Sequence, residues 1–591
     1  MAPIDSLSQD TQPYDPYTTT NLDATQSAQA QQVQQQPSGP ASNPDPVQAA
    51  HDVLGVGVRS GRDDYDARMV ALSDALKQGD PTYRSQLMGE ILKQDPNALN
   101  SWLQPSRAED LASSGKMTLE QEGRVAEGFA SVFNDGNLQT YKIGVGPTPG
   151  TGELGTVERN DIDHILDKYY NVAGFGTAPD RIQNAQDMRK FVDFINSSNG
   201  PEVAEFREKY AQHLIDQYVL NPAVGYNNPQ QRDAAAGLAG NLIGGDISRP
   251  DIAAKTLAKY DFDQVRTIME SAARSNGIYG EDAIKGEAAT RVDPSNGQPY
   301  NARDISVPNG AALIMDSVGL STSANADKVA TEIARLPANA SSIFDSKSIG
   351  GKDNTDALTL MVTNHSKPVF DTLAKYDDTY IGDKDNPNLQ QYMKNGSELG
   401  TLFKTTLFNP DSTYRGLLQD KVTQYAGELK NEVNQPGPNQ DAAGHLAMLS
   451  ASLTDGVRQG YTELAKDEAA KKEMLGMVVD IALAGLPVSK WAAKPVEDLI
   501  KNTFPSQSMQ EALNGLAGKL IDAPVGKLND AAKKAIVDAL GKSEGNLAIA
   551  QNLSNDLHNA FFNQVSSSDY DREFAQVSYN QILNGIQLAR K

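Results

Sequence analysis

The stretch MLGMVVDIALAGLPV, at residues 474–488, is the most apolar run in this chain of 591 residues. As a helix its 15 residues would span about 22 Å, because each residue adds about 1.5 Å. That length falls short of the roughly 30 Å hydrocarbon core of a bilayer. Asp480 lies in the middle of the run, where an ionised carboxylate is costly in lipid, and Gly485 and Pro487 interrupt its end. The run therefore predicts a buried core helix of a C-terminal bundle.

A second interpretation of the same run is a segment that enters a membrane as a hairpin continuing to Ile500. Protonation of Asp480 at low pH would then assist insertion. In the first interpretation the run is where the C-terminal bundle is assembled, and in the second it is also where the bundle acts. The residues expected to contact a membrane or a protein partner are Met474, Met477, Val478, Asp480, Ile481, Leu483, Leu486 and Trp491.

The composition bounds the class of protein. Hydrophobic residues make up 39% of the chain, and its length exceeds what one core accommodates, so we expect about two to four domains. The formal net charge of −23 repels a phosphate backbone at long range, so no nucleic-acid partner is expected. The absence of cysteine excludes disulfides, thiolate metal sites and cysteine nucleophiles.

Residues 1–58 contain no Lys or Arg, and the first basic residue is Arg59. The segment is rich in Gln, Ser, Thr, Pro and Ala, a composition that predicts disorder. It lacks the basic region and the apolar region of a cleaved secretory signal. Two interpretations stay open: a plain flexible tail, or an uncleaved export signal of a secreted bacterial protein. The bacterial cytoplasm is the alternative location.

Apolar residues recur at helical spacing along most of the chain. Tyr65, Met69, Leu72 and Leu76 form one such stripe, and Thr118 with Gln121 predicts a capping box. Sustained alternation typical of strands is missing, so the expected fold is all-α, with several helical bundles. The expected parts are a disordered tail at 1–58, a small helical domain at 59–143, a glycine-rich hinge at 144–156, a central helical domain at 157–435 and a C-terminal helical bundle at 439–591.

One hexapeptide occurs twice. Thr256–Asp261 reads TLAKYD, and the same letters return at Thr372–Asp377. Each copy ends a helical pattern and enters a turn. The repetition indicates either a duplicated helical unit or coincidence, because the flanking residues do not align.

The search for chemistry identifies no catalytic residues. His164 lies among Asp161, Asp163 and Asp167, but a solvated acidic helix face explains this group better than a metal site. The stretch 541–545, GKSEG, matches a nucleophile elbow by letter but follows a helical pattern instead of a strand. Neither a metal nor a cofactor is therefore expected.

The stretch Gly155, Val157 and Asp161 resembles the exit half of a calcium-binding EF-hand loop whose entry half is lost. The chain loosely resembles secreted bacterial effectors and polymorphic toxins. Besides the calcium-loop remnant, the resemblance rests on the N-terminal segment without Lys or Arg, the absence of cysteine, and the apolar run bordered by Lys471, Lys472 and Lys490. The resemblance implies export without a cleaved signal and action on another cell. A secretion chaperone or an immunity protein is a partner of the kind it implies.

The leading hypothesis is thus a non-enzymatic secreted effector or toxin whose C-terminal bundle binds a protein partner or perturbs a target-cell membrane. A hydrolase, for example one that cleaves cell-wall glycans with an unidentified catalytic pair, is the second. A helical interaction scaffold without toxicity is the third.

Overall fold

The computed structural model describes residues 44–57, 62–77, 79–136, 140–160, 163, 181–293, 297–375, 387–433, 440–464, 467–483 and 583. All helices and strands below belong to the compact unit Asp45–Lys591. The structure is mostly helical with a single two-stranded sheet, so the predicted all-α class is confirmed. Of the segment predicted to be disordered, residues 1–43 lie outside the described residues. Its last part differs from the prediction, because Pro46–Gly55 forms a helix that buries Ala50 and Val53.

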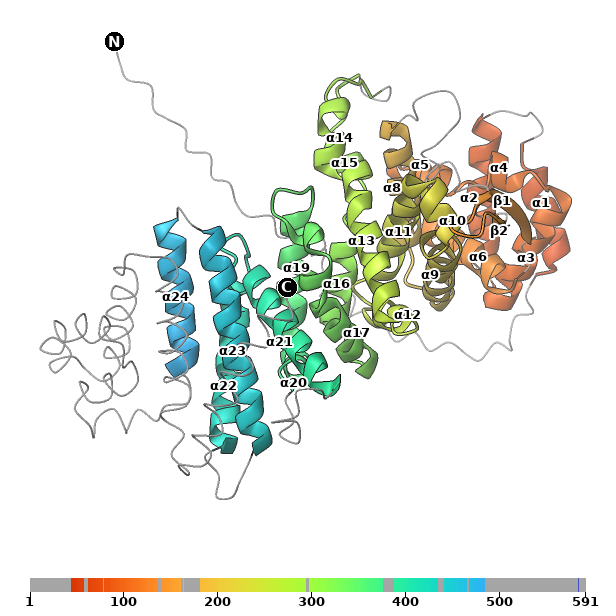
Figure 1. Ribbon diagram of the computed structural model, residues 1–591. Helices are drawn as coiled ribbons and strands as arrows, with labels where there is room; N and C mark the ends of the chain where they lie inside the picture. The colour runs from red at the N-terminus through yellow and green to blue at the C-terminus, as the bar shows by residue number, and fades with distance from the viewer. Residues whose placement is uncertain are drawn as a thin grey trace, which may run out of the picture. The chain divides into compact units, whose positions relative to one another are not determined.

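Six helices form the first part of the unit (Figure 1). Asp80 starts the third, accepting a hydrogen bond from the Tyr83 N–H, and Pro81 occupies its first turn. The predicted capping box of Thr118 and Gln121 is present. The helices are α1 (Pro46–Gly55), α2 (Arg62–Leu76), α3 (Pro81–Gln94), α4 (Ala98–Ser101), α5 (Pro105–Ser113) and α6 (Leu119–Asn134).

A β-hairpin follows, which the sequence analysis did not predict. Strands β1 (Thr140–Pro147) and β2 (Leu154–Asn160) pair antiparallel over the glycine-rich stretch assigned to a hinge. Gly150 and Gly152 take φ of 84° and 71° in the connecting turn, a conformation that favours glycine. The strands escaped prediction because glycines interrupt their alternation. A hinge function for residues 144–156 stays a prediction.

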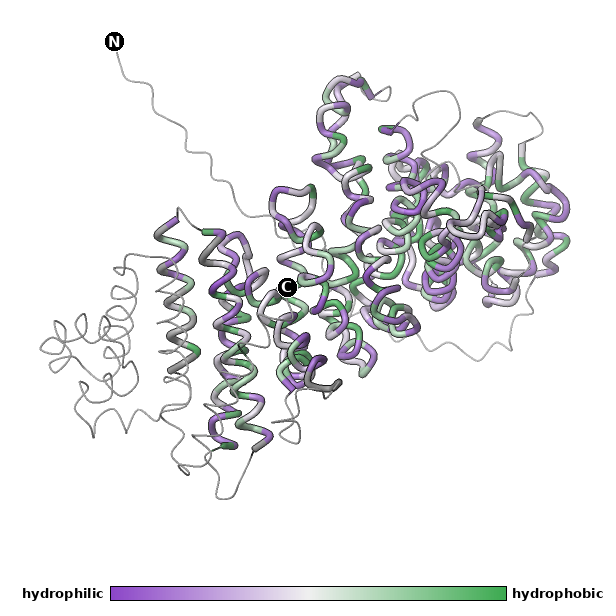
Figure 2. Tube along the Cα trace, viewed as in Figure 1, coloured by the Kyte–Doolittle hydropathy of each residue, from purple (hydrophilic) through white to green (hydrophobic). Residues whose placement is uncertain are grey.

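The chain then continues through further helices, along which hydrophobic and hydrophilic residues are interspersed (Figure 2). They are α8 (Arg181–Asn196), α9 (Pro201–Leu214), the π-helix η1 (Ile215–Val219), α10 (Pro222–Asn227), α11 (Pro229–Gly244), α12 (Asp251–Leu257), α13 (Phe262–Tyr279), α14 (Glu281–Ala288), α15 (Ala302–Ile305), α16 (Gly310–Leu320), α17 (Ala324–Ala334), α18 (Leu336–Asn339), the 3-10 helix η2 (Ser341–Phe344), α19 (Gly351–Asn364), α20 (Ser366–Leu373), α21 (Pro387–Thr405), α22 (Arg415–Val433), α23 (Gln440–Glu463) and α24 (Glu468–Leu483).

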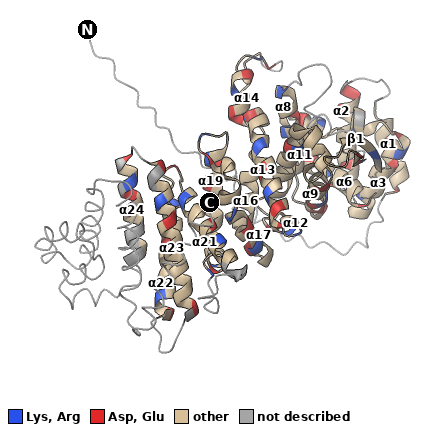
Figure 3. Cartoon of the chain, viewed as in Figure 1, with Lys and Arg blue, Asp and Glu red and all other residues tan. Residues whose placement is uncertain are grey.

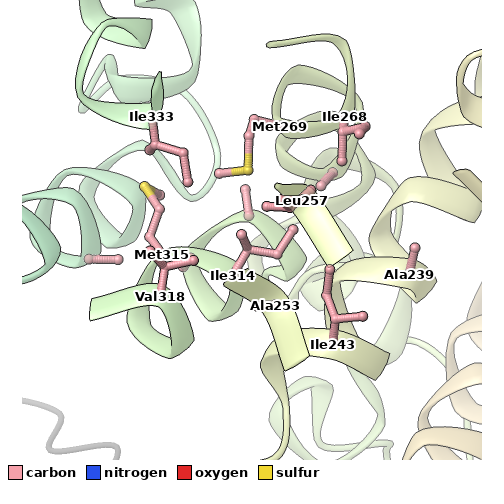
Figure 4. Packing of buried hydrophobic residues seen from close by; sticks show 14 of the residues in the cluster. Ala239, Ile243, Ala253, Leu257, Ile268, Met269, Ile314, Met315, Val318 and Ile333 are labelled. Carbon is pink, nitrogen blue, oxygen red and sulfur yellow. The ribbon is translucent and has the colours of Figure 1, made fainter. Parts of the chain in front are cut away.

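Three successive helix pairs stack on one another in the middle of this series. Helix α16 packs between α11 and α19, and α17 packs between α12 and α20. We call the pairs α11–α12, α16–α17 and α19–α20 the helix-pair stack. Its interior is apolar (Figure 4), filled by residues such as Ile243, Leu257, Ile314, Met315, Val318 and Ile333.

The described residues of the repeated hexapeptide, 256–261 and 372–375, occupy equivalent places in this stack. In the first copy α12 ends at Leu257, and Ala258 follows as its C-cap. In the second copy α20 ends at Leu373, and Ala374 is the C-cap. Each copy thus closes the second helix of a pair, which favours a duplicated helical unit over coincidence.

Glycines let the first helices of the three pairs approach closely. A Cβ atom on Gly240 of α11 would lie 2.7 Å from the carbonyl oxygen of Gly310 at the start of α16. One on Gly310 would lie 2.8 Å from the carbonyl oxygen of Gly237. One on Gly319 of α16 would lie 3.0 Å from the Cα atom of Met361 in α19. These contacts, which we call the glycine seam, leave no room for a side chain between the helices.

A buried arginine ties α8, α9 and α11 together. The Arg207 guanidinium on α9 is 1% exposed. It donates to the carbonyl oxygens of Ile195 at 3.1 Å and Leu242 at 3.2 Å, near the C-terminal ends of α8 and α11. Those ends carry partial negative charge, so a cation is favourable there. Burial nevertheless lowers the pKa of Arg207 to about 10.

Substitution of Gly240 tests the seam. We expect Gly240→Ala to lower the free energy of unfolding by about 1–3 kcal/mol, because the added methyl group overpacks against the backbone of Gly310. Gly277→Ala in α13 is the matched control. A Cβ there meets open space, so the better helix propensity of Ala should raise stability by about 0.5–1 kcal/mol. Urea titration of the full chain measures both, and equal effects would contradict the seam.

Candidate functional site

Three apolar residues of the run expected to act in the C-terminal bundle are buried in a core. On α24, Met474, Met477 and Ile481 are buried, as the spacing of a core stripe requires. Helix α24 packs against α22 and α23. The side chains of Val478, Asp480 and Leu483 are outside the described set, and Leu486 and Trp491 lie outside the described residues. Within the described part of the chain, no helix is both long and apolar enough to cross a membrane.

The π-helix η1 is the centre of the candidate site. Isolated π-turns are rare and are frequently found at functional sites. Side chains of this turn reach two neighbours. The Gln217 amide oxygen accepts a hydrogen bond from the N–H of Glu158 in β2, at 2.9 Å. Asp216 accepts one from the Tyr260 hydroxyl, also at 2.9 Å.

Beside this turn lies a polar group that we call the Asp163 cluster, comprising Asp163, Asn160, Tyr210 and His213. The Asp163 carboxylate is fully buried. It accepts hydrogen bonds from the Asn160 N–H at 2.8 Å and from the Tyr210 hydroxyl at 2.9 Å, and its Oδ2 atom lies 2.6 Å from Nε2 of His213. Neighbouring rings hold the imidazole: Tyr210 stacks on it and Tyr218 meets it edge-on.

Two roles are chemically open to the Asp163 cluster. A carboxylate that orients a histidine is the arrangement that prepares an imidazole to act as a general base through its other nitrogen. The side chain of His213 is 18% exposed, so Nδ1 is the atom through which it would act. The same bonds also tie the hairpin to α9.

The sequence analysis missed this pairing. It considered Asp163 only with Asp161, His164 and Asp167, and these three lie outside the described residues. Asp163 and His213 are 50 positions apart, and neither belongs to a motif. The only local signal was that His213 falls on the apolar stripe of α9, where a histidine needs a polar partner.

A shallow hollow of about 380 Å³ opens at the C-terminal end of η1. Its charged groups already have partners. The Arg232 Nε–H donates to Asp233 at 3.2 Å, and Asp261 caps α13. The hollow therefore combines apolar and paired polar groups. Its lining comprises Val219, Leu220, Asn221, Pro222, Gly225, Arg232, Asp261, Asp263, Gln264 and Thr267.

A second buried histidine serves the helix-pair stack. His365 stands between α19 and α20; its Nδ1 atom lies 2.8 Å from the Asp327 carboxylate on α17, and its Nε2 atom lies 2.8 Å from the carbonyl oxygen of Val318 on α16. Both partners accept hydrogen bonds only, so the ring meets both when both nitrogens carry protons. The side chain thus joins the second and third pairs of the stack.

Within the described ranges, no three His, Asp or Glu side chains converge as a metal-binding group. Acidic and basic residues are both scattered along the described helices (Figure 3). Comparison with protein-family models and with curated proteins identifies no match to this chain. Functional inference therefore rests on its own residues.

Removal of the His213 imidazole tests the Asp163 cluster. We expect His213→Ala to lower the free energy of unfolding by about 1–3 kcal/mol, because a buried carboxylate loses one of its partners. His51→Ala is the control, since that side chain is 78% exposed, and its effect should stay within about 0.5 kcal/mol. Urea titration reports stability, and hydrogen exchange of residues 140–160 reports whether the hairpin loosens. An effect of His213→Ala no larger than that of the control would contradict the conclusion that the Asp163 cluster holds the hairpin against α9.

Proposed function

We propose that this protein is a secreted bacterial effector or toxin-like protein that acts by binding a protein partner, without catalysis. The observation that carries the proposal is the helix-pair stack. In stacked helical architectures each unit contacts only its neighbours, and the accumulated surface serves to bind partners. The described chemistry points the same way, because the Asp163 cluster is bonded internally and the charged groups of the hollow are paired.

Binding is preferred over membrane perturbation because of the state of α24. An apolar segment that inserts in lipid must first leave its protein contacts. Burial of Met474, Met477 and Ile481 against α22 and α23 opposes that step, since each large apolar side chain contributes about 1.5–3 kcal/mol when buried. The C-terminal bundle is therefore better suited to present a surface than to release a membrane segment.

A hydrolase is the second candidate function, and the Asp163–His213 pair is the observation that favours it. The imidazole would serve as general base, with Asp163 fixing its orientation. Cell-wall glycan is the substrate class to test first, because glycan-cleaving enzymes need only carboxyl groups and water and require neither cysteine nor a cofactor.

One comparison separates these functions in the full-length chain. We expect no dye release from phosphatidylcholine–phosphatidylglycerol vesicles at pH 5 or 7, no soluble fragments from purified peptidoglycan, and saturable binding of the labelled chain to target-cell proteins. Dye release that Asp480→Lys abolishes would establish membrane action instead. Glycan cleavage that His213→Ala abolishes and His51→Ala preserves would establish the hydrolase.

Export without a cleaved signal is proposed separately, on the basis of residues 1–58, which contain no Lys or Arg. We expect residues 1–58 to direct a fused reporter out of a bacterium that carries a needle-type secretion apparatus, and to fail in a strain without it. Deletion of residues 1–43 from the full chain removes no described helix, so it should abolish export without changing the helical content seen by circular dichroism. Undiminished export of the deleted chain would overturn this part.

A further inference from the structure

A carboxyl group is buried where α5, α6 and α8 pack together. Glu122 on α6 is only 3% exposed, and its Oε1 atom has no hydrogen-bond partner among the described residues. Glu109 on α5 and Asp193 on α8 are the charged groups that act on it. All three helices are in mutual contact. We call Glu109, Glu122 and Asp193 the acid junction.

The basic side chains near the acid junction pair with carboxylates outside the junction or with only one of its members. Lys190 on α8 donates to Asp110 at 2.6 Å. Arg124 on α6 donates to Glu120 at 2.7 Å. Arg189 pairs with Asp193 at 2.8 Å and so neutralises only one member of the junction.

The charged side chains on the other helices that pack against α6 also have partners. Asp74 of α2 accepts a hydrogen bond from Gln121, and Arg84 of α3 pairs with Glu127. Glu202 of α9 lies on the far side of Arg84, at 4.0 Å. No charge in this set compensates an ionised Glu122 directly, so the junction stays acidic.

An ionised Glu122 is therefore costly in the packed structure. Burial, followed by the charges of Glu109 and Asp193, raises the pKa of Glu122 to about 8. Burial also raises the pKa of Glu109. The carboxyl group of Glu122 is thus protonated at neutral pH while the helices are packed, and water must enter before it can ionise.

We infer that the acid junction is a proton-controlled latch: α5 and α8 stay packed on α6 while Glu122 holds its proton, and ionisation of Glu122 loosens them. The direction follows from linkage. The folded state holds the Glu122 proton more tightly than the unfolded state, whose ordinary pKa is 4.5. Its contribution to stability is complete below about pH 4.5 and is lost progressively as the pH rises toward 8.

The helix-pair stack contains another buried carboxyl group, and its pKa is raised in the same way. Burial, followed by Asp353 and Asp356 of α19, raises the pKa of Asp316 on α16 to about 7. Asp356 accepts hydrogen bonds from the Thr413 N–H and from Lys352. Because both buried carboxyls favour acid, global stability mixes their effects, and a local measurement is needed to isolate the latch.

Hydrogen exchange of the full-length chain between pH 5 and 9, read at peptides of α5, α6 and α8, supplies that measurement. After correction for intrinsic exchange, the opening equilibrium of these helices should rise up to about tenfold per pH unit below pH 8. In Glu122→Gln this rise should disappear, while peptides of α16 and α19 keep their pH dependence. Glu120→Gln is the matched control on the same helix, because its side chain is 79% exposed, and it should behave as wild type.

An unchanged pH profile at α5, α6 and α8 in Glu122→Gln would overturn the latch. If that variant fails to fold, Asp193→Asn gives an independent test, since removal of one neighbouring charge should move the midpoint of loosening to lower pH. A midpoint that stays in place in Asp193→Asn would likewise overturn it.

Discussion

Close backbone contact along the glycine seam is the constraint on which the helix-pair stack depends. Gly240 and Gly310 let α11 and α16 lie at a separation that a Cβ atom on either residue would prevent. Glycine inside a helix costs about 1 kcal/mol of helix propensity relative to alanine. The packing recovers this cost, because close-packed backbones gain dispersion contacts and leave the larger apolar residues to fill the flanks.

Polar ties determine how the packed helices are oriented. Arg207 gathers the carbonyl ends of α8 and α11, His365 joins α16 and α17 to the third pair, and Asp163 holds the hairpin against α9. Apolar packing alone is non-directional, whereas each of these hydrogen bonds accepts only a narrow geometry. Together they explain why a chain with few aromatic residues can specify one arrangement of many similar helices.

Local features of the fold were predictable from the sequence, and long-range features were not. The stripe through Met69, Leu72 and Leu76 and the capping box at Thr118 depend only on residues a few positions apart, so periodicity and cap chemistry identify them. The hairpin escaped because glycines dilute its alternation. The Asp163–His213 pair and the acid junction depend on contacts between residues far apart in the chain, which a single sequence does not reveal. For α24, the periodicity indicated a core helix, and Met474, Met477 and Ile481 are indeed buried.

The π-helical turn Ile215–Val219 determines in which direction around the helix axis the neighbouring side chains point. Such a turn is an α-helix that has accommodated one additional residue. Because an α-helix rotates by about 100° per residue, loss of that residue would turn the following side chains about a quarter of the way around the helix axis. Gln217 and Asp216 would then no longer face β2 and Tyr260. The contact of Gln217 with the hairpin and the hollow at the end of η1 thus share a register that a single inserted residue maintains.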